Sequence, residues 1–399
     1  MKRIVMAAAV SAFAAGLAWG ASDAVKTDAA VKTEAAAGKA DGAAKPRVEV
    51  VFVIDTTGSM SGLIQAAKQK VWAIANTLAT ARPTPEIKMG LVAYRDRGDQ
   101  YVTKHTKLTD DLDAVYADLM NYKAEGGGDT PESVNQALYE AVTQQPWSTD
   151  AKTYRVIFLV GDAPPHMNYA DDVKYPETCR KAAAAGIVIN AIQCGNIIAE
   201  TAPFWTEIAQ KSEGRYFRVE QSGSAIVAST PFDAPLAEAS KKLDEGRVYY
   251  GDAAFQLKQA DRARTAERIA AEAPAAAVAT RASFNAGEAG RRNFAGSQEL
   301  VTDVADGKVK LGDVKEESLP ENLRKMSPKE REEFVAQKLA ERQKLQDQVK
   351  DLAAKRQKFM EEEAKKSAGK PSLDQGIFDS IKEQAGKRGI QYNQGGPAL

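Results

Sequence analysis

Two kinds of hydrophobic pattern alternate along residues 47–246. Apolar runs of strand length occur at 50–54, 87–94, 154–160, 187–193 and 215–219, and a more polar alternating run at 101–108 is typical of a sheet edge. Between them, apolar residues recur at helical spacing in 61–78, 112–122, 131–143, 177–185, 204–211 and 235–245. Strands that alternate with helices predict an α/β domain with a doubly wound, mostly parallel sheet covered on both faces. Functional residues are then expected at the carboxyl ends of the strands.

The strand–helix alternation ends near residue 246. Residues 247–326 predict a loosely ordered connector, in which Asp306-Gly307 is a hairpin signal. The glycine-rich residues 369–399 are expected to form a mobile tail. The chain therefore combines an α/β domain at 47–246 with a C-terminal extension.

A long charged helix is expected over residues 327–368. Ser327-Pro328 and Glu330 have the form of a helix-starting capping box. Beyond it, Lys338, Arg342 and Arg356 interrupt an apolar stripe at near seven-residue spacing, formed by Val335, Leu345, Val349, Leu352 and Phe359. This pattern is compatible with a coiled coil that engages a helical partner, with a helix lying along another surface, and with a solvated helix held by Glu/Lys pairs.

The N-terminus has the features of an export signal. Lys2 and Arg3 precede a short apolar run, and Ala18-Trp19-Gly20 supplies small residues for cleavage, which predicts a signal peptide over 1–20. Residues 21–46 are rich in Ala, Lys, Asp and Gly, and they predict a flexible linker. No later stretch is apolar enough for a transmembrane helix. We therefore expect a periplasmic or secreted protein.

Charge and cysteine content indicate which partners and which cross-links are expected. The 54 basic and 54 acidic residues give a formal net charge of zero, so no bulk attraction to nucleic acid or to an anionic membrane is expected. Cys179 in the first turn of a helix and Cys194 at the end of the next strand are expected at the same edge of the sheet. An exported protein permits a disulfide between them, but two buried thiols are equally compatible with the pattern.

Three loops at the predicted carboxyl edge carry clustered oxygen donors. The first holds Asp55, Thr57 and Ser59, the second holds Thr130, and the third begins with Asp162. Ser, Thr and Asp also cap turns and helices, but three such loops in order favour a metal site. An oxygen-only donor set suits a hard divalent cation, Mg²⁺ before a softer metal.

Two further residues near this edge are not expected to bind the metal. We interpret Asp129 as a turn residue before Pro131. His166 follows Pro164-Pro165 near the metal edge, but a lone histidine more often packs or hydrogen-bonds locally than binds a ligand.

The loop residues carry a resemblance to a known family. DTTGS at 55–59 resembles the D-x-S/T-x-S motif of von Willebrand factor type A (VWA) domains, Thr130 matches the threonine of their second loop, and Asp162 matches the aspartate after their fourth strand. The resemblance implies a Rossmann-like fold and a metal-ion-dependent adhesion site (MIDAS) that holds Mg²⁺, or Mn²⁺ or Ca²⁺. The stretches at 93–99 and 161–166 resemble bacterial members of the family.

The function that the resemblance implies is protein binding, as an adhesion or scaffold module of the cell envelope. A carboxylate from a partner protein would complete the coordination of the metal, and no enzymatic activity is expected. Two alternatives stay open. One is a Mg²⁺-dependent phosphatase-like hydrolase, although Thr57 stands where that chemistry uses a second carboxylate. The other is a structural envelope protein with a vestigial site.

Overall fold

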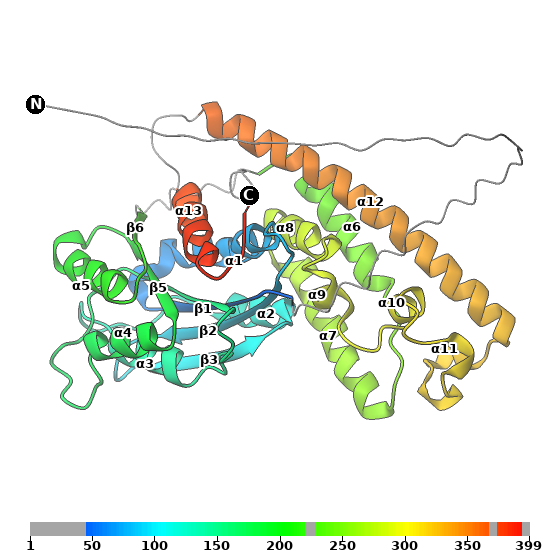
Figure 1. The fold of residues 1–399 in the computed structure, drawn as a ribbon, viewed down its shortest axis with the longest axis horizontal. Helices are drawn as coiled ribbons and strands as arrows, with labels where there is room; N and C mark the ends of the chain where they lie inside the picture. The colour runs from blue at the N-terminus through cyan, green and yellow to red at the C-terminus, as the bar shows by residue number, and fades with distance from the viewer. Residues whose placement is uncertain (1–44, 220–228, 367–372, 393–399) are drawn as a thin grey trace, which may run out of the picture. The chain divides into compact units, whose positions relative to one another are not determined.

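The computed structural model describes residues 45–219, 229–366 and 373–392 (Figure 1). The predicted signal peptide and residues 21–44 of the predicted linker lie outside the described residues, as do residues 369–372 and 393–399 of the predicted tail. Within the described part of the chain, no helix combines the length and the apolarity needed to cross a bilayer.

A six-stranded sheet forms the centre of the α/β domain (Figure 1). Its strands are β1 (Arg47–Asp55), β2 (Glu86–Tyr94), β3 (Thr103–Thr109), β4 (Tyr154–Gly161), β5 (Ile187–Cys194) and β6 (Tyr216–Val219), in the order β3-β2-β1-β4-β5-β6. The edge strand β3 pairs antiparallel with β2, and the other neighbouring strands pair in parallel. Every residue of β4 is buried, as expected of a central strand covered on both faces. The sheet confirms the predicted doubly wound α/β fold.

Side chains of β1 alternate between two hydrophobic cores. Val50, Phe52 and Ile54 belong to the core on one face, and Val51 and Val53 belong to the core on the other. The first face is covered by α1 (Ile64–Ala79), α2 (Leu112–Asn121) and α13 (Leu373–Gly386), and the second by α3 (Val134–Thr143), α4 (Tyr175–Ala184) and α5 (Ile198–Lys211).

Helix α13 comes from the stretch that we expected to be a mobile tail, and that expectation is wrong for residues 373–392. Ile377, Phe378 and Ile381 are buried in the core on the α1 face. Gln384 accepts a hydrogen bond from Tyr154 Oη on β4, at 2.7 Å. Glycines around this stretch give it the composition of a mobile tail, although its apolar residues recur at helical spacing.

The predicted loosely ordered connector is helical. It contains α7 (Ala253–Glu272), α8 (Ala275–Ala286), α9 (Arg291–Ala295), α10 (Leu300–Ala305) and α11 (Glu321–Arg324), and α6 (Asp233–Glu245) precedes it. The predicted hairpin is also wrong. Asp306 is the C-cap of α10, and Gly307, at φ 67°, donates its backbone N–H to Val304. An Asp-Gly pair satisfies a left-handed helix end as well as a hairpin turn.

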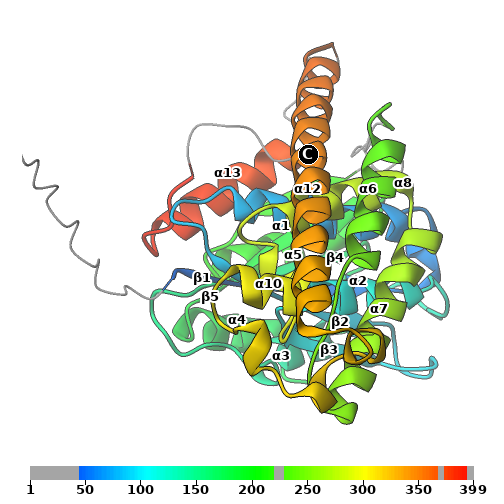
Figure 2. The same cartoon turned by 90° about the vertical axis from the view of Figure 1, so that its right-hand side faces the viewer.

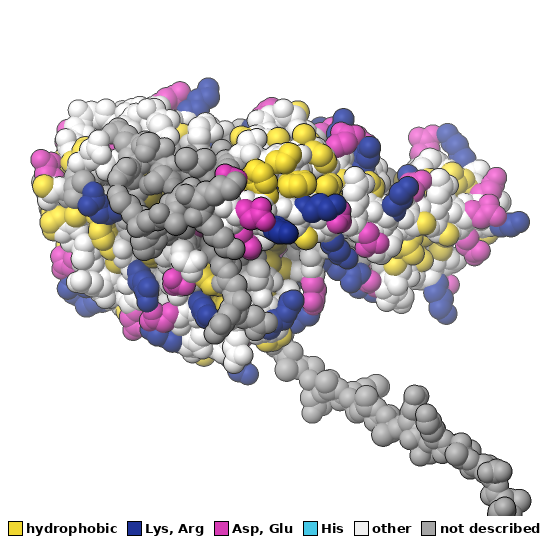
Figure 3. Space-filling model, turned by 90° about the horizontal axis from the view of Figure 1, so that it is seen from above, with side chains coloured by type: hydrophobic (Ala, Val, Ile, Leu, Met, Phe, Trp, Pro, Cys, Tyr) yellow, Lys and Arg dark blue, Asp and Glu magenta, His cyan; other side chains and the backbone are white. Residues whose placement is uncertain are grey.

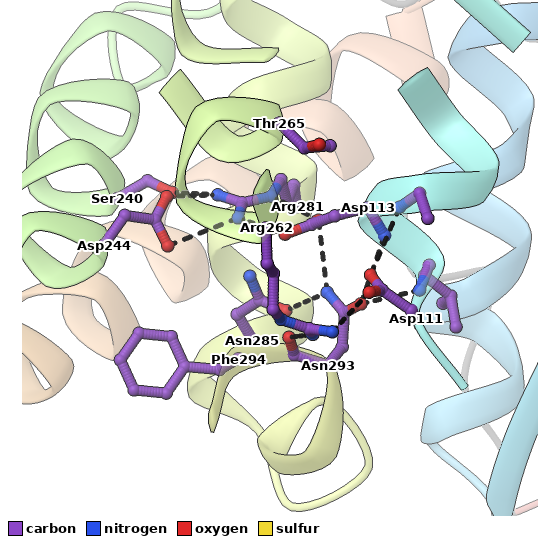
Figure 4. A network of polar contacts seen from close by, with 12 residues as sticks. Asp111, Asp113, Ser240, Asp244, Arg262, Thr265, Arg281, Asn285, Asn293 and Phe294 are labelled. Atoms are coloured by element: carbon purple, nitrogen blue, oxygen red, sulfur yellow. Dashed lines mark hydrogen bonds and ion pairs between the residues drawn. The ribbon is translucent and has the colours of Figure 1, made fainter. Parts of the chain in front are cut away.

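A buried arginine joins this extension to the sheet domain (Figure 4). Arg281 on α8 donates from Nε to Asp113 Oδ1 on α2, at 2.6 Å, and from Nη1 to Asp244 Oδ2 on α6, at 2.7 Å. Burial raises the pKa of Asp113, but the charge and hydrogen bonds of Arg281 outweigh burial and hold that pKa below its ordinary value. Asn293 Oδ1 accepts the backbone N–H of Leu112 at the start of α2.

The long helix α12 (Pro328–Lys366) lies along α6, α8 and α10 of the same chain (Figure 2). Two of the basic residues that interrupt its apolar stripe are buried and paired. Arg342 Nη1 lies 2.7 Å from Glu299 Oε2, and Arg356 Nε lies 2.7 Å from Asp233 Oδ1. The stripe that we expected to engage a helical partner is therefore used inside the chain, which is the second of the three arrangements compatible with its pattern.

Charged side chains of both signs are interspersed over the described part of the face drawn in Figure 3. That mixture agrees with the zero formal charge of the sequence.

Candidate metal centre

Strand β1 delivers Asp55 to the carboxyl edge of the sheet, where the chain turns sharply. Asp55 Oδ1 accepts the Thr57 backbone N–H at 2.8 Å and the Thr57 hydroxyl at 2.6 Å. This Asx-type turn leads into a 3₁₀ turn, η1 (Gly58–Gly62), which carries Ser59. The turn places Thr57 Oγ1 and Ser59 Oγ 3.1 Å apart.

The neighbouring strand β4 brings Asp162 to the same place. Ser59 Oγ donates to Asp162 Oδ1 at 3.0 Å, across more than one hundred residues of sequence. Four of the five predicted metal-site residues, Asp55, Thr57, Ser59 and Asp162, therefore form one continuous hydrogen-bonded group.

The fifth residue, Thr130, lies apart from that group. Its side chain is exposed, and it is on the loop that precedes α3. This loop does touch the first one, because Gly58 donates its backbone N–H to Gly126 at 3.0 Å, and Glu125 donates to Thr56 at 3.0 Å. The loop is thus in place, while the Thr130 hydroxyl is not part of the hydrogen-bonded group.

Asp55 is held in a place where a carboxylate is electrostatically costly. The residue is fully buried, and its Oδ2 has no hydrogen-bond partner among the described residues. Burial raises the pKa of Asp55 to about 7, and the negative charge of Asp162 is the second cause, although hydrogen bonds from Thr57 oppose the shift. Burial also raises the pKa of Asp162. Two carboxyl groups with raised pKa values, beside two hydroxyls, form a donor set that fits a hard divalent cation.

Glu132 is a third acid at this place, and the predicted metal-site residues do not include it. It is buried, and its Oε2 has no hydrogen-bond partner among the described residues. A Cβ added at Gly127 would lie 3.2 Å from both Glu132 Oε1 and Thr57 Cβ, so the glycine lets this acid approach the first loop. Burial raises the pKa of Glu132 to about 9, followed by the charges of Asp55 and Asp96. Its place directly after Thr130-Pro131 was the available signal.

A second group of ligand atoms lies in the neighbouring loops. Asp96, Asp129 and His166 each offer one ligand atom, and these atoms all lie within 4.8 Å of one another. The sequence indicates a turn residue at Asp129 and local packing for His166. In the structure both side chains face Asp96, for which the sequence predicts no role.

Cys179 and Cys194 are both free and buried, so a disulfide between them is wrong and the alternative of two buried thiols holds. They belong to the cores on opposite faces of the sheet. Cys179 is the fifth residue of α4 rather than part of its first turn, and the sheet separates the two sulfurs. Burial raises the pKa of each thiol to about 12.

A parallel sheet that gathers hydroxyls and acids at its carboxyl edge defines an α/β domain with a candidate divalent-cation centre. Residues 49–224 match the family model described as von Willebrand factor A domain. The match coincides with the sheet domain, so this part of the chain is similar to von Willebrand factor A domains.

Two curated relatives match part of the chain. The chain is 34% identical over 120 residues to von Willebrand factor A domain-containing protein 7 of Rattus norvegicus, which covers 30% of this chain and 12% of the rat protein. It is 22% identical over 199 residues to the putative ariadne-like RING finger protein R811 of Acanthamoeba polyphaga mimivirus, which covers 46% of this chain and 19% of the viral protein. The chain thus spans less than a fifth of the length of either relative.

A comparison with solved structures finds proximal thread matrix protein 1 (PTMP1) from the mussel byssus. The likeness has a TM-score of 0.34 and 14% sequence identity, and it covers 44% of this chain and 42% of the mussel chain.

Proposed function

We propose that the domain binds a partner protein through a divalent cation, Mg²⁺ before Mn²⁺ or Ca²⁺. Asp55, Thr57, Ser59 and Asp162 would hold the ion directly or through water, and Thr130 would join them from the second loop. The ion would supply a positively charged coordination position for a carboxylate of the partner. The protein would act as an adhesion or scaffold module, without turnover.

One observation carries this proposal: the buried Asp55 Oδ2 lacks a hydrogen-bond partner among the described residues, while Asp162 adds negative charge beside it. An unpaired buried carboxylate is costly unless a cation or a proton compensates it. The protein's own residues prepare the site, because Thr57 and Ser59 fix the positions of Asp55 and Asp162 before any ion arrives.

The arrangement favours binding over hydrolysis. A phosphatase of the haloacid-dehalogenase kind needs an acid two residues after its nucleophile, whereas Thr57 stands there and donates its hydroxyl to Asp55 Oδ1. The place of action that we propose, the periplasm or the cell exterior, is supported by the sequence of residues 1–20 alone.

A metal-dependent capture experiment tests the proposal. The full chain is immobilised and exposed to cell-envelope extract with Mg²⁺ or with a chelator, beside Asp55→Ala and, as a control, Asp347→Ala on the exposed side of α12. We expect proteins that bind wild type and Asp347→Ala only with Mg²⁺, that are lost from Asp55→Ala, and that free acidic peptide displaces. Capture that ignores the chelator, or sustained phosphatase turnover with Mg²⁺, would contradict the proposal.

A further inference from the structure

Three loops at the carboxyl edge converge on a second cluster, which the proposed function does not use. Asp96 follows β2, Asp129 precedes α3, and His166 follows β4. His166 Nε2 lies 3.1 Å from Asp96 Oδ2 and 3.6 Å from Asp129 Oδ1. These three ligand atoms differ in kind from those around Asp55, because one of them is an imidazole nitrogen.

The imidazole of His166 is held in one orientation. The residue is 2% exposed, its ring stacks on Tyr169 with the centroids 4.0 Å apart, and its backbone N–H donates to Glu132. Its Nδ1 lies 2.8 Å from Asn168 Oδ1, which can only accept a hydrogen bond, so Nδ1 carries the proton. Nε2 then faces two carboxylate oxygens, a position that either a proton on Nε2 or a metal ion can occupy.

The Asp96 carboxylate is oriented in the same way. Ser133 Oγ donates to Asp96 Oδ1 at 2.8 Å, and Tyr169 Oη donates to Asp96 Oδ2 at 2.8 Å. Partners of this kind, which fix the direction of a ligand from behind, are typical of metal sites. The Asp129 side chain is 60% exposed and leaves one side of the cluster open to solvent. An ion can therefore enter, and water can complete its coordination.

We propose that Asp96, Asp129 and His166 bind a first-row transition-metal ion, Zn²⁺ or a Zn²⁺-like divalent ion, at a site distinct from the oxygen-only centre around Asp55. Imidazole together with carboxylates suits Zn²⁺, Mn²⁺ or Fe²⁺, whereas hydroxyls and carboxylates alone suit Mg²⁺. The two sites thus select different ions from the same solution. This inference goes beyond the proposed function and does not depend on it.

The chain offers a matched control, because the sequence contains two histidines. His105 Nε2 lies 2.6 Å from Glu140 Oε2, away from the three loops. We would titrate Co²⁺, as a spectroscopic probe of the Zn²⁺ site, into the full chain with Mg²⁺ present. The variants are His166→Asn, Asp129→Asn, His105→Asn and Asp55→Ala, each checked for native folding by circular dichroism.

We expect one equivalent of Co²⁺ to produce visible d–d absorption in wild type, His105→Asn and Asp55→Ala, and Zn²⁺ to displace it. His166→Asn should lose the band, and Asp129→Asn, an exposed change that leaves the fold intact, should bind at least about tenfold more weakly. Histidine NMR should show Zn²⁺ shifting the His166 ring signals and not those of His105. A band that survives in both His166→Asn and Asp129→Asn, or that depends on His105, would overturn the proposal.

Discussion

The Asp55 carboxyl shows how one residue couples pH to stability in this domain. Its pKa is about 7 in the fold against 3.8 as the ordinary value, and the pKa of Glu132 is about 9 against 4.5. The folded protein without metal therefore binds protons that the unfolded chain releases. Stability from these groups is fully present below about pH 4 and falls as the pH rises through 7 and 9, on the order of 1.4 kcal/mol for each pKa unit.

A first prediction follows from the direction in which these two pKa shifts change stability with pH. In a chelator, the free energy of unfolding should decrease from pH 5 to pH 9, and Mg²⁺ should restore more of it at pH 8 than at pH 6, because protons compete with the ion. Urea unfolding at several pH values measures this dependence. Asp55→Asn should flatten the slope in the chelator, and an unchanged slope would contradict the role assigned to Asp55.

A second prediction concerns Glu132. Because its carboxyl must take up a proton to be buried at pH 7, Glu132→Gln should raise the melting temperature of the metal-free protein. The same change should reduce the stabilisation that Mg²⁺ provides, since one anionic group near the ion is gone. Thermal unfolding with chelator and with Mg²⁺ gives both numbers, with Glu125→Gln on the exposed loop as the control. A metal-free protein destabilised by Glu132→Gln would refute this assignment.

Some residues of the candidate site could be predicted from the sequence, and others could not. Asp55, Thr57, Ser59 and Asp162 were predictable because strand ends carry them to one edge of the sheet. Glu132 and the group around His166 were not, because their significance lies in contacts between loops rather than in spacing. Thr130 was predicted on the correct loop, but a sequence motif does not determine the direction of an exposed hydroxyl.

At the scale of elements, the strands could be predicted because burial on both faces gives them continuous apolar runs. The helices of the extension could not be placed in the same way, because their positions depend on contacts between residues far apart in the sequence. Arg342 and Arg356 looked like interruptions of an apolar stripe on α12, but each is buried against a carboxylate of another helix. The Asp306-Gly307 signal was assigned to a hairpin, although the same dipeptide also closes a helix. A local sequence pattern predicts the type of turn, but it does not predict which other element a helix packs against.

A third prediction tests the attachment of α8. Arg281→Ala leaves the fully buried carboxylate of Asp113 without its ion-pair partner, and Asp244 with Arg247 alone, so it should cost about 3–5 kcal/mol of unfolding free energy. Arg264→Ala on α7 removes a pair whose side chains are 69% exposed, and it should change stability by less than about 0.5 kcal/mol. Urea unfolding compares the two variants. Small effects of equal size would show that the buried network does not hold α8 against α2 and α6.

At the scale of the whole molecule, the sheet domain is completed from the far end of the chain. Helix α13 packs on the α1 face, where Phe378 and Ile381 are buried and Gln384 hydrogen-bonds Tyr154 on β4 and Asn190 on β5. Composition alone suggested a mobile tail, because glycine-rich flanks obscured a short amphipathic helix. The α/β domain and the extension therefore belong to one compact unit over the described residues.

A fourth prediction follows from this closure. Phe378→Ala should destabilise the whole domain by about 3–5 kcal/mol through the cavity it leaves, although it lies more than 150 residues beyond β6. Lys387→Ala, whose side chain is 58% exposed, serves as the control and should be nearly neutral. The fluorescence of Trp72 and Trp205, buried on opposite faces of the sheet, reports unfolding. A native-like stability of Phe378→Ala would show that α13 is not part of the core.

The central claim, a divalent-cation centre around Asp55, is tested most directly by calorimetric titration of the full chain with Mg²⁺. We predict saturable binding by wild type and by Asp347→Ala, no measurable heat from Asp55→Ala, and about 2.7 kcal/mol of added stability at one hundred times the dissociation constant. Equal heats from wild type and Asp55→Ala, or none from either, would contradict the account.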